Sequence, residues 1–344
     1  MVQKMDSIVL ANRPLGDAEL GNFRLETAEL PQPGPNEFLA RTIWLSLDPY
    51  MRGRMNDTKS YSPPVGIDEP MEGGCVAEVM KSNNADYSVG DIILDRLGWT
   101  SHGISKGIGV RKIDPIIAPI SSNLGVLGMP GLTAWVGLND ILEAQPGETI
   151  VISAATGAVG SLAGQLAKLK GMRVIGIAGG YEKTQYAINE LGYDVCIDHK
   201  SASLHELRQQ ISVAAPNGVD CYFENVGGKT LEAILPLLNT FARIALCGMI
   251  AWYSPQATKT AGLIPAVWGA ILRQRLRVRG FIIFDHYDRM DAFLEEVAPM
   301  VSNGTIKYKE TVSLGLSSAP QSFLNLLEGK NFGKQLVRVG DDPK

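Results

Sequence analysis

From about Glu148 onward, short β-branched runs alternate with segments whose apolar residues recur at helical spacing, the last of them running to Leu238. Gly171 and Gly192 follow two of these segments where a helix C-terminal cap would place them. Parallel neighbours need a crossover, so strands that alternate with helices build a parallel sheet covered on both faces. Six such strands predict a complete doubly wound dinucleotide-binding fold of the α/β Rossmann type. The predicted strands are Ile150–Ser153, Val174–Ala178, Val195–Asp198, Val219–Phe223, Ile244–Cys247 and Val278–Ile283.

The first 125 or so residues lack this alternation and read as a β-rich domain. Prolines at 31, 33 and 35 mark a loop, and "CVAEVM" and "YSVGDIIL" read as short strands joined by turns. After Gly304 the pattern changes again, to "IKYKETVSL", a short helix over Ala319–Leu327 and a last strand in "GKQLVRVG". That tail is too short to form its own core, so we expect it to pack on a domain already built. The predicted domains are 1–125, β-rich; 126–303, nucleotide-binding; and 304–344, the tail.

Composition excludes several classes of partner. The formal charge of −4 over 344 residues removes the electrostatic term on which nucleic-acid binding relies. The longest apolar patch, Gly262 to Leu272, is far shorter than the roughly 20 residues that span a bilayer, and the first residues do not resemble a signal peptide. We therefore expect a cytoplasmic protein. A reducing compartment is also indicated by four cysteines that form no close pair: Cys75, Cys196, Cys221 and Cys247.

The stretch "VISAATGAVG" carries the first candidate site. A strand ends at Ser153, small residues follow, and a helix starts, so Gly157 would let the backbone approach a pyrophosphate and Gly160 would let the helix pack on the sheet. Ala155 stands where the first glycine of the usual G-x-G-x-x-G would be, which predicts that this position needs no positive φ. The alternative is a mere strand-to-helix turn; its place among six alternating strands favours the cofactor.

The end of the second strand indicates which cofactor binds. NAD sites usually place an acid there to hold the ribose 2′-hydroxyl, but this strand ends in Gly179–Gly180. Lys183 follows within reach of a 2′-phosphate, so we predict NADP(H). Glu182 counts against this prediction, because a backbone rotation would aim it at the ribose. Lys183 would otherwise be a solvated cation at a helix start.

Histidine and cysteine spacing bears on whether a catalytic metal is present. Catalytic zinc needs three protein ligands, and no histidine forms a short-spaced ligand set with a cysteine. We therefore expect no metal, and hydrogen bonds would have to activate a hydride acceptor. The four histidines are His102, His199, His205 and His286.

Six motifs carry a family resemblance: "WLSLDPYMRGRM", "GMPGLTAWVGL", "GAVGSLAGQLAKLKG", "DCYFENVGG", "RIALCGMIAWY" and "GKNFGKQLV". They are similar to the zinc-independent medium-chain dehydrogenase/reductases, in the branch of NADP-dependent prostaglandin, alkenal/one and curcumin reductases. The similarity runs from about Ile43 to Val337. It implies a GroES-like N-terminal domain that the tail completes, a Rossmann domain inserted between them, and a homodimer.

The resemblance also implies a reaction. In this family NADPH transfers a hydride to the β-carbon of an α,β-unsaturated ketone or aldehyde, and negative charge develops on the carbonyl oxygen as an enolate. By similarity Tyr253, helped by the cofactor ribose hydroxyl, donates a hydrogen bond to that oxygen; a tyrosine stays protonated at neutral pH. Tyr50 resembles the family's second active-site tyrosine across the cleft. Each tyrosine also has a purely packing alternative, in the cleft wall or at the domain boundary.

Cofactor contacts follow from the resemblance position by position. Asn225 and Asn331 are also typical of turns that bond their own backbone. His199 departs from the pattern, since it stands in "DHK" where the relatives commonly have a tyrosine that borders the adenosine phosphate; a histidine could still donate to a phosphate, more strongly when protonated. The implied contacts are Gly157, Ala158, Val159, Gly160, Lys183, His199, Asn225, Cys247, Gly248, Met249, Ile250, Tyr253, Phe281, Ile282, Ile283 and Asn331.

Two other functions stay open at this point. A zinc-free quinone reductase uses the same fold and NADPH, and a non-catalytic relative would bind NADPH as a sensor. Substrate choice would depend on "MNDTKSYSPPVGIDEP" and "SPQATKTAGLIPAVWGAIL". In the second segment Leu263, Ile264, Trp268 and Ile271 suggest an apolar wall suited to lipid-derived or aromatic enones, or else a surface packed on the domain or a partner subunit.

Overall fold

The structure, a computed structural model, describes residues 3–253 and 264–343. Contacts between residues divide the chain into two units, one of Met1–Leu124 with Glu310–Lys344 and one of Gly125–Lys309. Within the described ranges, no helix is both long enough and apolar enough to span a bilayer.

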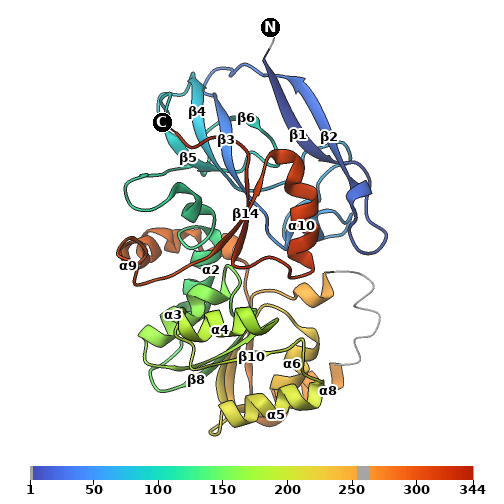
Figure 1. The fold of residues 1–344 in the computed structure, drawn as a ribbon, viewed down its shortest axis with the longest axis vertical. Helices are drawn as coiled ribbons and strands as arrows, with labels where there is room; N and C mark the ends of the chain where they lie inside the picture. The colour runs from blue at the N-terminus through green and yellow to red at the C-terminus, as the bar shows by residue number, and fades with distance from the viewer. Residues whose placement is uncertain (1–2, 254–263, 344) are drawn as a thin grey trace. The chain divides into compact units, whose positions relative to one another are not determined.

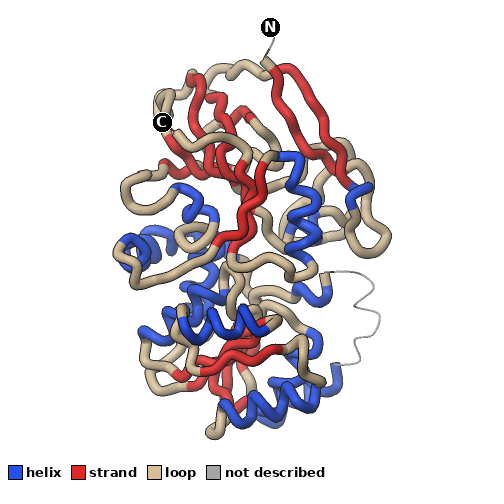
Figure 2. Tube along the Cα trace, viewed as in Figure 1, coloured by secondary structure: helices blue, strands red, loops and turns tan. Residues whose placement is uncertain are grey.

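The unit of Gly125–Lys309 is built on a six-stranded sheet of order β10-β9-β8-β11-β12-β13, and every neighbouring pair is parallel. Numbered along the chain, this order is 3-2-1-4-5-6, that of a doubly wound dinucleotide fold, so the predicted Rossmann domain is confirmed. Figure 2 shows the strands of this unit flanked by helices. The strands are β8 (Thr149–Ser153), β9 (Arg173–Ala178), β10 (Val195–Asp198), β11 (Val219–Glu224), β12 (Leu238–Leu246) and β13 (Arg277–Gly280). The helices are α2 (Met129–Val136), α3 (Gly160–Leu169), α4 (Tyr181–Asn189), α5 (Leu204–Ala214), α6 (Gly228–Ile234), α8 (Ile264–Gln274) and α9 (Met290–Ser302).

Two strand boundaries in this unit differ from the sequence prediction by more than one residue. Leu238 begins β12 instead of closing a helix, because α6 gives way to a short 3-10 turn that contains Pro236, which has no N–H to continue the helix. The last strand ends at Gly280, and a 3-10 helix begins at Ile283, so the segment 281–283 lies beyond the strand. The two predicted capping glycines are confirmed: Gly171 and Gly192 have φ of +79° and +73°, the left-handed conformation that ends a helix.

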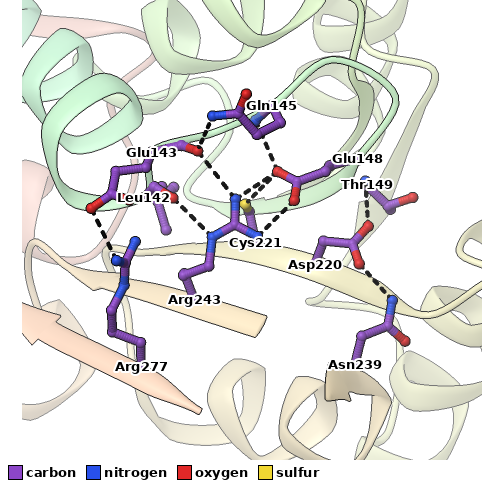
Figure 3. A network of polar contacts seen from close by, with 10 residues as sticks. All are labelled: Leu142, Glu143, Gln145, Glu148, Thr149, Asp220, Cys221, Asn239, Arg243 and Arg277. Atoms are coloured by element: carbon purple, nitrogen blue, oxygen red, sulfur yellow. Dashed lines mark hydrogen bonds and ion pairs between the residues drawn. The ribbon is translucent and has the colours of Figure 1, made fainter. Parts of the chain in front are cut away.

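The amino-terminal edge of this sheet is tied by a network of polar contacts (Figure 3). Arg243 in β12 donates from Nη1 and Nη2 to the two carboxylate oxygens of Glu148 at 2.7 and 2.6 Å, and its Nε donates to the Leu142 carbonyl at 2.9 Å. Asp220 accepts from the Thr149 backbone N–H at 2.9 Å. Burial alone would raise the pKa of the Glu148 carboxyl, but the hydrogen bond and charge of Arg243 outweigh it and the pKa is lowered. This edge is therefore structural and lies at the strand ends away from the predicted cofactor residues.

The other unit combines the N-terminal segment with the C-terminal tail. In its seven-stranded sheet the tail strands β14 and β15 extend the N-terminal strands in the order β14-β15-β3-β4-β5-β7, and β6 pairs with β3. Figure 1 shows the red tail elements beside the blue and cyan strands. The elements are β1 (Lys4–Leu10), β2 (Phe23–Glu29), β3 (Phe38–Ser46), α1 (Met51–Arg54), β4 (Cys75–Ser82), β5 (Ile92–Asp95), β6 (His102–Ser105), β7 (Arg111–Lys112), β14 (Glu310–Leu314), α10 (Ala319–Leu327) and β15 (Lys334–Arg338).

The tail helix α10 supplies part of this unit's apolar core. Phe323 is fully buried and packs edge-on against Trp99, with ring centroids 5.6 Å apart, while Phe23 stacks on Trp99 at 5.6 Å. Leu316, Leu326 and Val337 join the same cluster. The predicted helix over Ala319–Leu327 is confirmed, and its burial shows why the tail packs on the N-terminal segment.

The four cysteines are free thiols. Burial is the main cause that raises the pKa of Cys75, Cys196, Cys221 and Cys247, each to about 12. They are therefore protonated at neutral pH and behave as small apolar side chains, which is compatible with the expected reducing compartment.

Candidate functional site

The predicted cofactor residues of the Rossmann unit follow the carboxyl ends of its six strands. Because the sheet is parallel, these ends share one edge, and the strand order reverses there between β8 and β11. Ligands of open α/β sheets bind at such a switch point. The segments at this edge are 154–160 after β8, 179–183 after β9, 199–200 after β10, 225–228 after β11, 247–253 after β12 and 281–283 after β13.

The turn between β8 and α3 has the form of a phosphate cradle. A Cβ at Gly160 would lie 2.3 Å from the Ala154 carbonyl oxygen, so only glycine fits there, whereas a Cβ at Gly157 would lie 3.2 Å from the same oxygen. Ala155 has no positive φ, as predicted; the left-handed residue is Ala154, at +50°. The N–H groups of Val159 and Gly160 meet no acceptor within residues 3–253 and 264–343. Unpaired donors at a helix start suit a pyrophosphate.

Basic side chains gather over the turn that follows β9. A Cβ at Gly179 would meet Lys200 Cε at 2.9 Å and His199 Nε2 at 3.1 Å. Lys183 lies in the first turn of α4, and its pKa is lowered by burial and then by the charge of Lys200. The structure thus brings together two predicted residues, Lys183 and His199, with Lys200, which sequence reasoning missed although it is the last residue of the quoted "DHK".

An acidic residue, Asp198, lies at this end of the sheet, and its carboxylate is hydrogen-bonded to backbone N–H groups. The Asp198 carboxylate accepts from the Gly180 N–H at 2.8 Å and the Lys200 N–H at 2.9 Å. These bonds outweigh burial and lower its pKa. Lys229 fixes the next turn, since its Nζ donates to the carbonyls of His199 at 2.6 Å and Ala202 at 2.8 Å. Burial, and after it the charge of Lys229, lowers the pKa of His199, so its imidazole is neutral at pH 7 in the free protein.

The segments after β11 and β12 are hydrogen-bonded to each other. The Asn225 carbonyl accepts from the Ile250 N–H at 3.3 Å, and the Val226 carbonyl accepts from the Ala251 N–H at 3.0 Å. The Asn225 side chain donates to the Ser153 carbonyl at 2.8 Å, so it joins two strand ends and does not cap its own turn. The structure therefore brings the predicted residues 225 and 247–253 into one loop cluster.

Glu224 organises this cluster, and the sequence analysis missed it. Its carboxylate is buried and accepts from the backbone N–H of Val226 at 2.7 Å and Gly227 at 2.9 Å, and from Ser153 Oγ at 3.0 Å. Burial raises the pKa of the carboxyl despite these bonds. An acid at the end of the apolar run "DCYFE" was the available signal.

Tyr253 follows a 3-10 turn over Ile250–Trp252 and folds back over the start of its own loop. The Met249 N–H approaches Tyr253 Oη at 3.4 Å, and a Cβ at Gly248 would lie 3.2 Å from that oxygen. The hydroxyl is therefore held against the 248–249 backbone and remains partly accessible. On the next strand end, the Phe281 ring is buried and packs edge-on against Phe223, with centroids 6.5 Å apart.

Tyr50 and Asn331 belong to the unit of Met1–Leu124 and Glu310–Lys344. Burial, and after it the charge of Asp48, raises the pKa of Tyr50 well above its usual range, so the hydroxyl remains protonated. Lys334 donates to Asp48 Oδ1 at 2.8 Å, a buried ion pair that ties the tail strand to the turn before Tyr50. The Asn331 amide donates to the Gly333 carbonyl at 2.8 Å, the turn role that asparagine often has.

The predicted apolar substrate wall lies partly beyond the described residues, because Leu263 and the segment 254–263 are outside them. Ile264 and Trp268 of α8 are exposed, whereas Ile271 packs on the core. Of the residues that are described, no three His, Cys, Asp or Glu side chains form a group that could hold a metal ion.

Comparisons with known proteins cover both units. A family profile described as "N-terminal domain of oxidoreductase" matches residues 6–113, and one described as "Zinc-binding dehydrogenase" matches residues 158–299. The NADPH-dependent curcumin reductase of Escherichia coli is 48% identical over 337 residues, with 97% of each chain covered. Prostaglandin reductase 1 of Rattus norvegicus is 40% identical over 92% of this chain and 94% of its own. The crystal structure of CurA in complex with NADPH from Vibrio vulnificus superposes with a TM-score of 0.92 at 47% identity, covering 98% of this chain and 100% of that one.

Proposed function

The chain belongs to the zinc-independent medium-chain dehydrogenase/reductases, in the branch of NADP-dependent prostaglandin, alkenal/one and curcumin reductases, and on that basis we propose its reaction and the residues that perform it. It is an NADP-dependent oxidoreductase. The proposed reaction is reduction of the carbon–carbon double bond of α,β-unsaturated ketones or aldehydes. The observation that carries this proposal is the hydroxyl of Tyr253, held over the Gly248–Met249 backbone in the loop where the nicotinamide would lie.

The carboxyl edge of the sheet would hold the dinucleotide along its length. The α3 start would take the pyrophosphate on the N–H groups of Val159 and Gly160, which meet no acceptor among the described residues. Lys183, His199 and Lys200 would take the 2′-phosphate, since three basic groups over Gly179 suit a dianion. Asp198 ends β10 and not β9, the strand whose end carries the ribose-binding acid of NAD sites, and its Oδ1 accepts from two backbone N–H groups; Glu182 is exposed.

The chemistry then depends on where charge develops in the substrate. NADPH would supply a hydride to the β-carbon of the enone and become NADP+, and a proton from water would then reach the α-carbon to give the saturated product. The electron pair of the double bond moves toward the carbonyl oxygen, where the Tyr253 hydroxyl would donate a hydrogen bond. The 3-10 turn and the Met249 contact fix the oxygen of that hydroxyl in advance, so little reorganisation is needed. The resemblance gives Tyr50 the role of a second active-site tyrosine, and its hydroxyl is also protonated.

Removal of the Tyr253 hydroxyl tests the catalytic role. We expect Tyr253→Phe to lower kcat for NADPH oxidation with 3-nonen-2-one by roughly ten- to a thousandfold, the usual cost of losing an oxyanion donor. The dissociation constant for NADPH should stay unchanged. Tyr87→Phe is the matched control, because it removes a hydroxyl that bonds two carbonyls in the other unit, and it should keep the full rate. A Tyr253→Phe enzyme with the wild-type rate would remove this residue from the mechanism.

The same assay separates the alternatives. A quinone reductase would oxidise NADPH with a quinone and leave the enone untouched. A sensor would bind NADPH tightly and turn over neither substrate. Faster turnover of the enone than of the quinone would support the proposed reductase.

We also propose that two copies associate through the β13 edge of the sheet. β13 is an outer strand, all four of its residues are exposed, and the neighbouring α8 carries three exposed apolar side chains, Ile264, Trp268 and Leu272. An open edge beside an apolar stripe favours pairing. Sedimentation should give twice the chain mass, and Trp268→Glu should shift the protein toward the monomer. A wild-type monomer at micromolar concentration would contradict this assembly.

A further inference from the structure

Tyr193 lies in the turn between α4 and β10, and the catalytic scheme above does not use it. Its side chain is 2% exposed. The hydroxyl donates to the Gly160 carbonyl at 2.8 Å and has the Ala155 carbonyl as a second acceptor at 3.3 Å. Those two carbonyls bracket the turn that would hold the pyrophosphate. A side chain from the far side of β9 therefore reaches both ends of the turn.

Two glycines make the space that this ring occupies. A Cβ at Gly164 of α3 would lie 2.2 Å from carbons of the Tyr193 ring, and a Cβ at Gly176 of β9 would lie 2.9 Å from it. Both distances are too short for any side chain. The helix and the strand thus leave a slot for this ring, which sets the position of the hydroxyl under the turn.

The hydroxyl acts on the turn through its carbonyls. Because the Tyr193 hydroxyl holds the carbonyl oxygens of Ala155 and Gly160, the peptide groups between these two residues rotate less freely. The N–H groups at the start of α3 therefore keep one direction. Anion binding at a helix start depends on N–H groups that converge before the ligand arrives. We propose that Tyr193 is a positioning residue that holds the pyrophosphate turn in its binding conformation. This inference rests on the proposed NADPH site.

The test compares ligands that do and do not reach the turn. NADPH and NADH both carry the pyrophosphate, whereas 2′-AMP reaches only the basic cluster of Lys183, His199 and Lys200. We expect Tyr193→Phe to raise the dissociation constants for NADPH and NADH by the same factor, about three- to tenfold, which is the effect of losing one buried hydrogen bond. The dissociation constant for 2′-AMP should stay unchanged. The rate at saturating NADPH should not change, because Tyr193 bonds the turn at 155–160, whereas the nicotinamide would lie at the loop 247–253.

Tyr87→Phe controls for loss of a structural hydroxyl. Tyr87 also bonds two carbonyls, of Gly107 at 3.1 Å and Val110 at 3.2 Å, but in the other unit, so its removal should lower the melting temperature without altering any of the three dissociation constants. The positioning role would be overturned if the Tyr193→Phe protein had wild-type dissociation constants for both dinucleotides. It would also be overturned if the dissociation constant for 2′-AMP rose by the same factor as those for the dinucleotides. Wild-type protein that binds neither NADPH nor 2′-AMP would instead refute the proposed function and, with it, this inference.

Discussion

Gly157 and Gly160 lie in the same turn and should respond to alanine in opposite ways. At Gly160 the new methyl would lie 2.3 Å from the Ala154 carbonyl oxygen and 3.0 Å from Ala155 Cα. Both are backbone atoms, so no rotamer change relieves the clash and α3 must shift from β8. At Gly157 the methyl would lie 3.2 Å from the same oxygen, which a shift of a few tenths of an ångström accommodates. We propose that it would then occupy part of the space that the pyrophosphate takes.

The expected magnitudes follow from these clearances. Gly160→Ala should lower the free energy of unfolding by about 2–3 kcal/mol, as overpacking does, measured by urea titration. Gly157→Ala should change it by less than about 0.5 kcal/mol, as a tolerated surface change does. The dissociation constant for NADPH, measured by fluorescence titration, should rise roughly tenfold or more in Gly157→Ala, the loss expected when a close backbone contact is pushed apart. Equal stability of the two variants, or NADPH binding by Gly157→Ala at wild-type affinity, would refute the division of roles.

Three further predictions concern charge. Lys183→Ala should raise the dissociation constant for NADPH about tenfold or more and leave that for NADH unchanged, because only NADPH carries the 2′-phosphate. An equal rise for both would contradict the assignment of Lys183 to the 2′-phosphate. Burial and the charge of Lys229 lower the pKa of His199, so the imidazole gains its proton only below neutral pH; NADPH affinity should therefore be flat above pH 7 and rise below it, and His199→Asn should remove that rise. The lowered pKa of Glu148 means that its pairing with Arg243 stabilises the fold above the unfolded pKa and loses that effect as pH falls through the folded one. Glu148→Gln should therefore cost about 1 kcal/mol at pH 7 and less near pH 3, by urea titration at each pH; a constant cost would contradict this.

The sheet was predictable because its signals are local and repeated. Each strand of the Rossmann unit is a short apolar run, and segments with apolar residues at helical spacing lie between the strands. The order of elements therefore follows without knowledge of tertiary contacts. Gly171 and Gly192 could be placed for the same reason, since a helix end requires a left-handed residue. The assignment of Leu238 to a strand could not be predicted, because Leu238 continues the apolar spacing of the helix. Only the turn that contains Pro236 separates the helix from β12.

Residues of the candidate site divide in a similar way. Lys183 and the glycine turn are adjacent to strand ends and could be read from the chain. Tyr193 could not, because its role depends on Gly164 and Gly176 leaving a slot between a helix and a strand that only the fold brings together. Glu224 was missed although an acid ends the apolar run "DCYFE", because two of its three partners are backbone N–H groups, which the sequence does not reveal.

If this chain transfers a hydride from NADPH to the β-carbon of an enone, a deuterium label on NADPH must arrive at that carbon. Wild-type protein would be incubated with [4-²H]NADPH, prepared as each 4-position epimer, and 3-nonen-2-one, and the product analysed by mass spectrometry and NMR. We expect saturated nonan-2-one that carries one deuterium at the former β-carbon with one of the two epimers. An allylic alcohol, or no turnover by protein that binds NADPH, would contradict it.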